Sequence, residues 1–228
     1  MSGLKAQGKS YTPYLIKRAI QNSGMDIKDP MNVKFIQVSK AWNYLEKSLS
    51  ALNFNLSYDL EVGNGRGVYL RDLDETSRLN SFVVNVQPKF VKMDDPAQNA
   101  SKLQMEARLC LEPTHAWINT PENVHLNNGG RGFGFQVDPT RLEPGFHFGQ
   151  IHAYDANARN LGPLFSVPIT ITKPDPIHIH RQTGAEAPSY IKYSDLTFGP
   201  GEILRRFVSV PAGANYAGMT MVLDMFYT

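Results

Sequence analysis

The sequence has a single cysteine, no long hydrophobic run and no excess of charge of one sign. One cysteine in 228 residues, Cys110, cannot form an internal disulfide bond, which excludes a disulfide framework and favours a reducing compartment. The apolar runs are only a few residues long, far short of the ~20 residues that a transmembrane helix needs. The opening residues, MSGLKAQGKSYTPY, lack the apolar stretch of a secretory signal peptide. We therefore expect a cytoplasmic protein with no membrane partner.

Charge is balanced along the chain. Lys+Arg 23 and Asp+Glu 21 leave a formal net charge of +2, and no block of like charges occurs. Because proteins that bind nucleic acids gather Lys and Arg into patches, no nucleic-acid partner is expected. Hydrophobic residues make up 42% of the chain and aromatic residues 11%, which is enough for a packed core in one large domain or two small ones.

The stretch EVGNGRGVYLRD carries glycines at every second position, Gly63, Gly65 and Gly67. A dinucleotide-binding loop needs G-x-G-x-x-G between a strand and a helix. Here the spacing is one residue short, and the Val-Tyr-Leu that follows favours a strand. Apolar and polar residues alternate over 56–62 before the loop, so Asn64-Gly65 predicts the turn of a β-hairpin rather than a phosphate-binding loop.

Residues 1–52 are predicted to be helical. Thr12-Pro13 is typical of a helix start and Gly24 of a helix end, and a second helix is expected to begin near Ser39. Such helices normally cover a parallel sheet that this chain lacks, so part of their apolar surface is expected to be exposed. The side chains concerned are Leu15, Ile16, Ile20, Trp42 and Leu45.

From residue 53 onward, short apolar runs recur between turn residues. They lie at 54–62, 68–70, 81–88, 103–111, 116–119, 132–137, 146–154, 164–172, 177–180, 204–210 and 219–226. Strands at this spacing without intervening helices predict an antiparallel β-sandwich. The expected fold is thus mainly β, with a helical unit at 1–52 and one or more sandwich domains at 53–228. The chain ends in a strand pattern with no turn after it, which suggests a sandwich that is cut at the carboxyl end.

Histidines offer one candidate metal site. His178 and His180 lie on one face of a predicted strand, a spacing that can bind zinc if Asp175, His147 or His152 supplies a third ligand. A solvated or hydrogen-bonded pair is the alternative. His147 and His152 are separated by an odd number of residues, so they should point to opposite faces of their strand and cannot act together.

The acidic stretch RDLDETSRLN resembles a calcium loop only in part. Asp72, Asp74 and Thr76 occupy its odd positions, but Ser77 stands where glycine is required and Val83 where the bidentate glutamate is required. A solvated loop is therefore the expected structure.

Nucleophilic chemistry is not indicated by any local motif. Cys110 lies between Leu109 and Leu111, and we interpret it as a buried structural thiol. The motifs that expose a serine at a helix start, G-x-S-x-G and G-T-S-x, do not occur. From the residues alone we predict no catalytic residue, no metal site and no cofactor.

Residues 137–171, VDPTRLEPGFHFGQIHAYDANARNLGPLFSVPITI, resemble a segment of the tripeptidyl peptidase II family of giant cytosolic subtilisin-like serine peptidases. The shared pattern is D-P-x-x-L-x-x-G-x-H, then Y-D, then G-P-L-F-x-V-P-I-T. Residues 64–72, NGRGVYLRD, are similar to the family's N-x-R-G-I-Y-L-R-D. Residues 193–217 are similar to its F-x-P-G-x-I-x-R-x-F-x-x-V-P-x-G-A-x-W, with Tyr216 in place of Trp. The resemblance covers nearly the whole chain and is weakest at 173–190.

The helical start resembles the same family. Residues 2–24 are similar to the end of the helix that carries the nucleophilic serine, followed by the next helix. In such enzymes the serine lies in G-T-S-M-S-x-P, and Met1 falls after that motif, so the catalytic triad would lie upstream. The resemblance implies a large homo-oligomeric enzyme that removes tripeptides from free amino termini of peptides through an acyl-enzyme. Without the serine, this chain is expected to be inactive by itself.

Two other functions stay open at this stage. One is a binding module whose sandwich loops hold a peptide or a sugar. The other is a structural role, in which the sandwich holds neighbouring subunits together in an oligomer.

Overall fold

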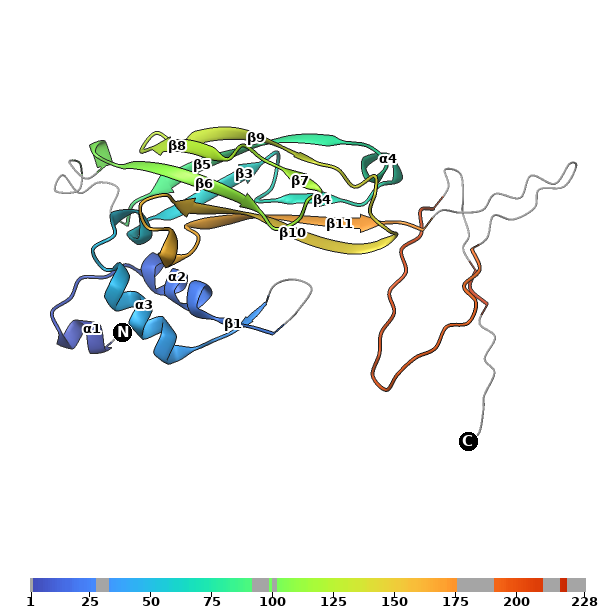
Figure 1. The fold of residues 1–228 in the computed structure, drawn as a ribbon, viewed down its shortest axis with the longest axis horizontal. Helices are drawn as coiled ribbons and strands as arrows, with labels where there is room; N and C mark the ends of the chain where they lie inside the picture. Colours follow the sequence, from blue (N-terminus) through green and yellow to red (C-terminus); the bar gives the residue numbers. More distant parts are fainter. Residues whose placement is uncertain are drawn as a thin grey trace, which may run out of the picture.

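The computed structural model describes residues 2–27, 33–91, 99, 102–175, 191–210 and 218–220. Figure 1 shows a β-sandwich, a group of helices packed against one end of it, and an extended segment on the carboxyl side of the last strand. None of the helices in these ranges is long and apolar enough to cross a membrane.

The helices α1, α2 and α3, with the short strands β1 and β2 between the last two, come first in the chain, and the strands of the sandwich follow. The helices are α1 (Ser2–Ala6), α2 (Pro13–Ser23), α3 (Val38–Ser48), α4 (Leu73–Thr76), and the 3-10 turns η1 (Leu52–Asn55) and η2 (Arg159–Leu161). The strands are β1 (Met25–Asp26), β2 (Lys34–Phe35), β3 (Ser57–Val62), β4 (Val68–Leu70), β5 (Asn80–Lys89), β6 (Glu106–Pro113), β7 (Ile118–Asn119), β8 (Asn123–Asn127), β9 (Arg131–Val137), β10 (Gly145–Asp155) and β11 (Phe165–Lys173).

Two sheets form the sandwich. The five-stranded sheet has the order β4-β11-β10-β6-β8, and the four-stranded sheet has the order β3-β5-β9-β7. Their strand pairs are antiparallel except for β4 and β11, which run parallel. The predicted mainly β fold, an antiparallel β-sandwich preceded by helices, is confirmed.

The core lies between the two sheets and follows from the alternation of apolar residues along each strand. On β11, Val167, Ile169 and Ile171 are fully buried, and Ile151 of β10 lies directly opposite Val167. The four-stranded sheet contributes buried side chains as well, such as Val84 on β5. Fully burying a side chain of this size contributes about 1.5–3 kcal/mol, so these strands hold the sheets together.

One strand was not predicted, and three predicted runs differ from the structure or lie wholly or partly outside it. A strand missing from the prediction, β8, lies at Asn123–Asn127, between residues that are typical of turns. The predicted strand at 204–210 is reduced to a single bridge, between Val208 and Asp175. The run at 177–180 lies outside the described residues, and of the run at 219–226 only residues 219 and 220 are described and are not in a strand.

Helix α2 begins and ends as predicted. The Thr12 hydroxyl accepts a hydrogen bond from the Leu15 amide (3.1 Å), and Gly24 caps the helix after Ser23. Helix α3 ends at Ser48 and is therefore shorter than the helical region predicted up to residue 52. The Asn55 amide donates to the carbonyls of Leu49 and Ala51 (both 3.2 Å) and so satisfies groups left free at the helix end.

The prediction of exposed apolar helix surface is wrong for Leu15 and Leu45, which are 0% and 8% exposed. Ile16 and Trp42 are half-buried, and Ile20 is exposed as predicted. The reason is that α2 and α3 pack against each other and that α2 packs against η1, next to the sandwich. Their buried residues join the sandwich core in a single hydrophobic cluster.

Candidate functional site

The glycine loop forms a turn but not a hairpin. Val62 and Gly65 exchange two backbone hydrogen bonds (2.8 and 3.0 Å) around Gly63 and Asn64, and Gly63 has a φ of +55°. The turn therefore lies one residue before the predicted one. The predicted hairpin is wrong, because β3 belongs to the four-stranded sheet and β4 pairs with β11 in the other sheet. The chain crosses between the sheets here.

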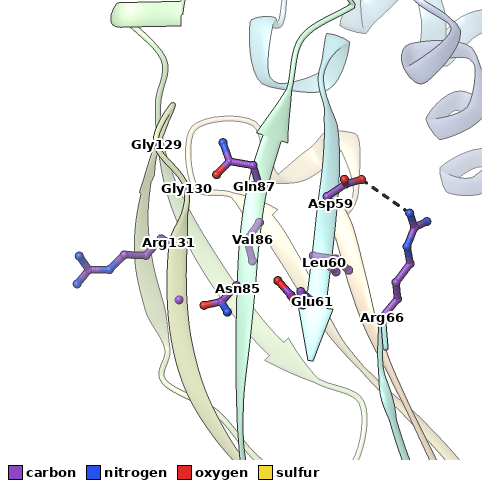
Figure 2. Close-up of a pocket in the computed structure, with 11 residues that line it drawn as sticks. Asp59, Leu60, Glu61, Arg66, Asn85, Val86, Gln87, Gly129, Gly130 and Arg131 are labelled. Atoms are coloured by element: carbon purple, nitrogen blue, oxygen red, sulfur yellow. Dashed lines mark ion pairs between the residues drawn. The ribbon is translucent and has the colours of Figure 1, made fainter. Parts of the chain in front are cut away.

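A hollow of about 650 Å³ lies on the outer face of the four-stranded sheet next to this turn (Figure 2). Gly130 and Gly132, just before and near the start of β9, lie against the amide side chains of Gln87 and Asn85 on β5. A Cβ at Gly132 would lie 2.8 Å from the side-chain oxygen of Asn85, so the Asn85 amide occupies the space above the glycine. The glycines thus allow the two amide side chains to approach the backbone closely.

Charged and amide groups line the hollow, and several already have partners. Asp59 forms ion pairs with Lys89 and with Arg66 (3.9 Å), the latter drawn in Figure 2. Gln87 donates to the Asn128 carbonyl (3.0 Å). Its described lining includes no serine, cysteine or histidine. The hollow is therefore a shallow polar surface whose carboxylates are those of Asp59, which is already ion-paired, and Glu61.

The structure brings together one serine and one histidine that lie far apart in sequence. His152 on β10 and Ser166 on β11 are cross-strand neighbours, and His152 Nδ1 lies 2.7 Å from Ser166 Oγ. Burial, and then the charge of Lys34, lower the pKa of His152. Glu112, opposite His152 on β6, forms an ion pair with Arg159 instead. The pair therefore lacks the carboxylate that orients a catalytic histidine, and it serves as a cross-strand hydrogen bond.

The other histidines of the predicted set do not meet. His147 and His152 lie on opposite faces of β10, as predicted from their spacing, and His147 Nε2 lies 2.7 Å from the Glu143 carbonyl. Asp175 accepts a hydrogen bond from the Tyr193 hydroxyl (2.6 Å). His178 and His180 lie outside the described residues. Within those residues there is no group of three side chains that could hold a metal ion.

The acidic stretch forms a short helix rather than the predicted loop. Asp72 precedes α4, and the Glu75 carboxylate accepts from the Asp72 amide (3.3 Å). Asp74 forms an ion pair with Arg78 (3.1 Å), and the Thr76 hydroxyl donates to the Asp72 carbonyl (2.9 Å). The carboxylates that could have bound calcium instead stabilise one helical turn.

The prediction of a buried thiol is wrong. On β6, Leu109 and Leu111 are buried in the core, so the alternation of the strand directs Cys110 to the outer face of the sheet. Its side chain is half-buried, and Sγ lies 3.5 Å from the amide oxygen of Asn123.

Arg18, on α2, is a buried charged side chain with several backbone partners. It is 6% exposed, and its guanidinium donates to the carbonyls of Phe54, Leu56 (2.9 Å) and Leu164 (3.0 and 3.2 Å). The cation also lies 5.7 Å from the centre of the Phe54 ring and 5.6 Å from that of Tyr58. Burial is the main cause that lowers the pKa of Arg18 from its ordinary value, and carbonyl oxygens and aromatic faces compensate for the lost water.

Asn22, one turn further along α2, makes similar contacts. Its amide donates to the carbonyls of Leu161 (2.9 Å) and Pro163 (3.1 Å) and to the Tyr44 hydroxyl of α3 (3.1 Å). Burial raises the pKa of Tyr44 to about 12, so the hydroxyl stays protonated. We call Arg18 and Asn22 with their carbonyl acceptors the helix–sandwich junction. Sequence patterns did not indicate it, because its acceptors are backbone atoms.

Comparison with known proteins identifies the family. The model of the tripeptidyl-peptidase II first Ig-like domain matches residues 54–172, half of the chain. Tripeptidyl-peptidase 2 of Arabidopsis thaliana is 31% identical over 242 residues and aligns with the whole chain, and that of Drosophila melanogaster is 31% identical over 97% of it. A crystal structure of tripeptidyl peptidase 2 superposes with a TM-score of 0.73 at 30% identity over 79% of the chain.

The chain spans only part of these proteins. It covers 17% of the Arabidopsis thaliana relative, 16% of the Drosophila melanogaster relative and 15% of the crystallised chain. The matched residues 54–172 span both sheets of the sandwich, from β3 to all but the last residue of β11. The chain therefore belongs to the tripeptidyl-peptidase II family, and its sandwich is the first Ig-like domain of that family.

Proposed function

We propose that this chain acts as part of a larger, cytoplasmic serine peptidase that releases tripeptides from free amino termini of peptides. The observation that carries the proposal is the match of the whole chain to proteins named tripeptidyl-peptidase 2, of which it spans about a sixth. Residues 1–52 would be the last helices of a subtilisin-like catalytic domain, and residues 53–228 the sandwich region behind it. The serine, histidine and aspartate of the triad would come from the rest of the polypeptide.

In this proposal the chain contributes structure and not chemistry. Among the described residues, the one serine–histidine contact, between Ser166 and His152, lacks a carboxylate partner for the histidine. A peptidase of this type needs a serine, a base and an oxyanion hole in one site. The sandwich would therefore support the catalytic domain and, in a large homo-oligomer, neighbouring subunits.

An activity assay tests this function. Purified chain 1–228 and the full-length polypeptide that contains it are each given a tripeptide–fluorophore substrate with a free amino terminus and, as a control, the same substrate with an acetylated terminus. We expect cleavage of the free substrate by the full-length polypeptide only. Activity of purified 1–228 that survives further purification would refute the structural role, and inactivity of the full-length polypeptide would refute the peptidase.

A contact role between subunits is a second candidate that a specific observation favours. Large apolar side chains are exposed around the short β1–β2 ribbon, with Phe35 63% and Ile36 56% exposed. Isolated apolar side chains are common on surfaces, but neighbouring ones mark interaction sites. Sedimentation of the full-length polypeptide with Phe35→Ser and Ile36→Ser tests it: smaller assemblies are expected, and unchanged assemblies would exclude this surface.

A further inference from the structure

We propose that Arg18 is a positioning residue, through which the sandwich holds the helices α1, α2 and α3 in a defined place. The catalytic part of this inference rests on the proposed function; its structural part does not. If α1 is the end of the helix that carries the nucleophilic serine and α2 is the helix after it, the sandwich supports the peptidase domain.

The acceptors of Arg18 show why one side chain can do this. Leu56 lies immediately before β3, an edge strand of the four-stranded sheet, and Phe54 lies in η1, which leads into it. Leu164 lies immediately before β11, in the five-stranded sheet. The guanidinium therefore joins α2 to the entry points of both sheets, across sequence separations of 36, 38 and 146 residues.

Only arginine suits this position. Its planar fork offers five N–H donors in a rigid array, whereas lysine offers three donors around a single nitrogen. No acidic side chain among the described residues forms an ion pair with Arg18, so its role is to satisfy carbonyls and not to balance a charge. Removing the guanidinium would leave buried carbonyl oxygens without donors, which costs more than the hydrogen bonds contribute.

Further contacts hold the helix–sandwich junction in place. Asn22 binds the carbonyls of Leu161 and Pro163, just ahead of the Leu164 that Arg18 binds. The Thr12 hydroxyl donates to the Asn55 carbonyl (3.1 Å). Three side chains of one helix region thus hold two loops of the sandwich. Leu4 of α1 is fully buried in the same hydrophobic cluster, which extends the constraint to the first helix.

Hydrogen exchange measured by mass spectrometry tests the structural part on chain 1–228. In Arg18→Met, exchange in α1, α2 and α3 is expected to be at least about tenfold faster, with β9 and β10 within about twofold of wild type. Lys17→Met, an exposed neighbour on the same helix, is the control and should change neither. Equal acceleration throughout, or none, would overturn the proposal. If Arg18→Met does not fold, Arg18→Lys and Asn22→Ala provide the same comparison.

Kinetics of the full-length polypeptide test the catalytic part. Arg18→Met should lower kcat between about tenfold and about hundredfold with little change in KM, because a displaced nucleophile loses rate and not binding. Millimolar methylguanidine should restore part of the kcat of Arg18→Ala, and Lys17→Met should match wild type. If Arg18→Met speeds hydrogen exchange in the helices but leaves kcat unchanged, Arg18 does not position catalytic groups. The proposed peptidase function is unaffected by that result. An inactive wild type would instead refute the proposed function and, with it, the catalytic part, whereas the exchange result would stand.

Discussion

Gly67 on the approach to β4 packs against Pro168 of β11 with no room for a side chain. A Cβ on Gly67 would lie 2.7 Å from Pro168 Cγ and nearer still to the Pro168 carbonyl oxygen. The contact lies at the start of the parallel pair, in which Val68 is opposite Ile169. The glycine therefore permits the crossing of the chain from one sheet to the other.

Replacing this glycine should destabilise the sandwich. Gly67→Ala is expected to lower the free energy of unfolding by about 1–3 kcal/mol, because backbone or proline must shift to admit the methyl group. Gly65→Ala is the control, since the nearest atom to a Cβ there is 3.7 Å away. Urea unfolding followed by tryptophan fluorescence measures both. Equal midpoints for the two variants would contradict the close approach.

Two valines test the assignment of core and outer face. Val167 on β11 is fully buried, whereas Val83 on β5 is 59% exposed. Val167→Ala should lower the free energy of unfolding by about 2 kcal/mol, since it leaves a cavity between the sheets. Val83→Ala removes the same atoms from the surface and should change it by less than about 0.5 kcal/mol. Urea unfolding measures both changes. Equal losses of free energy of unfolding for Val167→Ala and Val83→Ala would contradict the assignment of core and outer face.

His152 should make stability depend on pH. Its pKa is lowered in the folded protein, so below the unfolded value of about 6.5 the unfolded chain binds more protons. The free energy of unfolding should then decrease as the pH falls through 6.5 toward the pKa of His152 in the folded protein. Above pH 6.5 the stabilisation that depends on neutral His152 should be fully present. His152→Gln should flatten this slope. Urea midpoints between pH 5 and pH 8 measure it, and parallel curves for both proteins would argue against a shifted pKa.

Cys110 should react without unfolding. Because its side chain is half-buried on the outer face of β6, Ellman's reagent should modify one thiol per folded chain. Cys110→Ser should give no signal and should leave the thermal midpoint within about 2 °C of wild type. A thiol that reacts only in urea would instead place Cys110 in the core, as its neighbours Leu109 and Leu111 first suggested.

Local patterns in the sequence predicted the elements better than their pairing. Thr12, Pro13 and Gly24 marked both ends of α2, because capping acts within a few residues. The short strand β8 was missed, since five residues between turn signals carry too little periodicity.

The sequence by itself determined a mainly β fold, its helical start and its family, because apolar spacing, turn residues and shared motifs are all local or linear features. Tertiary structure decided which strands pair, that β3 and β4 belong to different sheets, and that Cys110 faces outward. It also decided the helix–sandwich junction. Arg18 meets three backbone carbonyls there, and a backbone carbonyl is present at every residue, so only the folded chain shows which ones it binds.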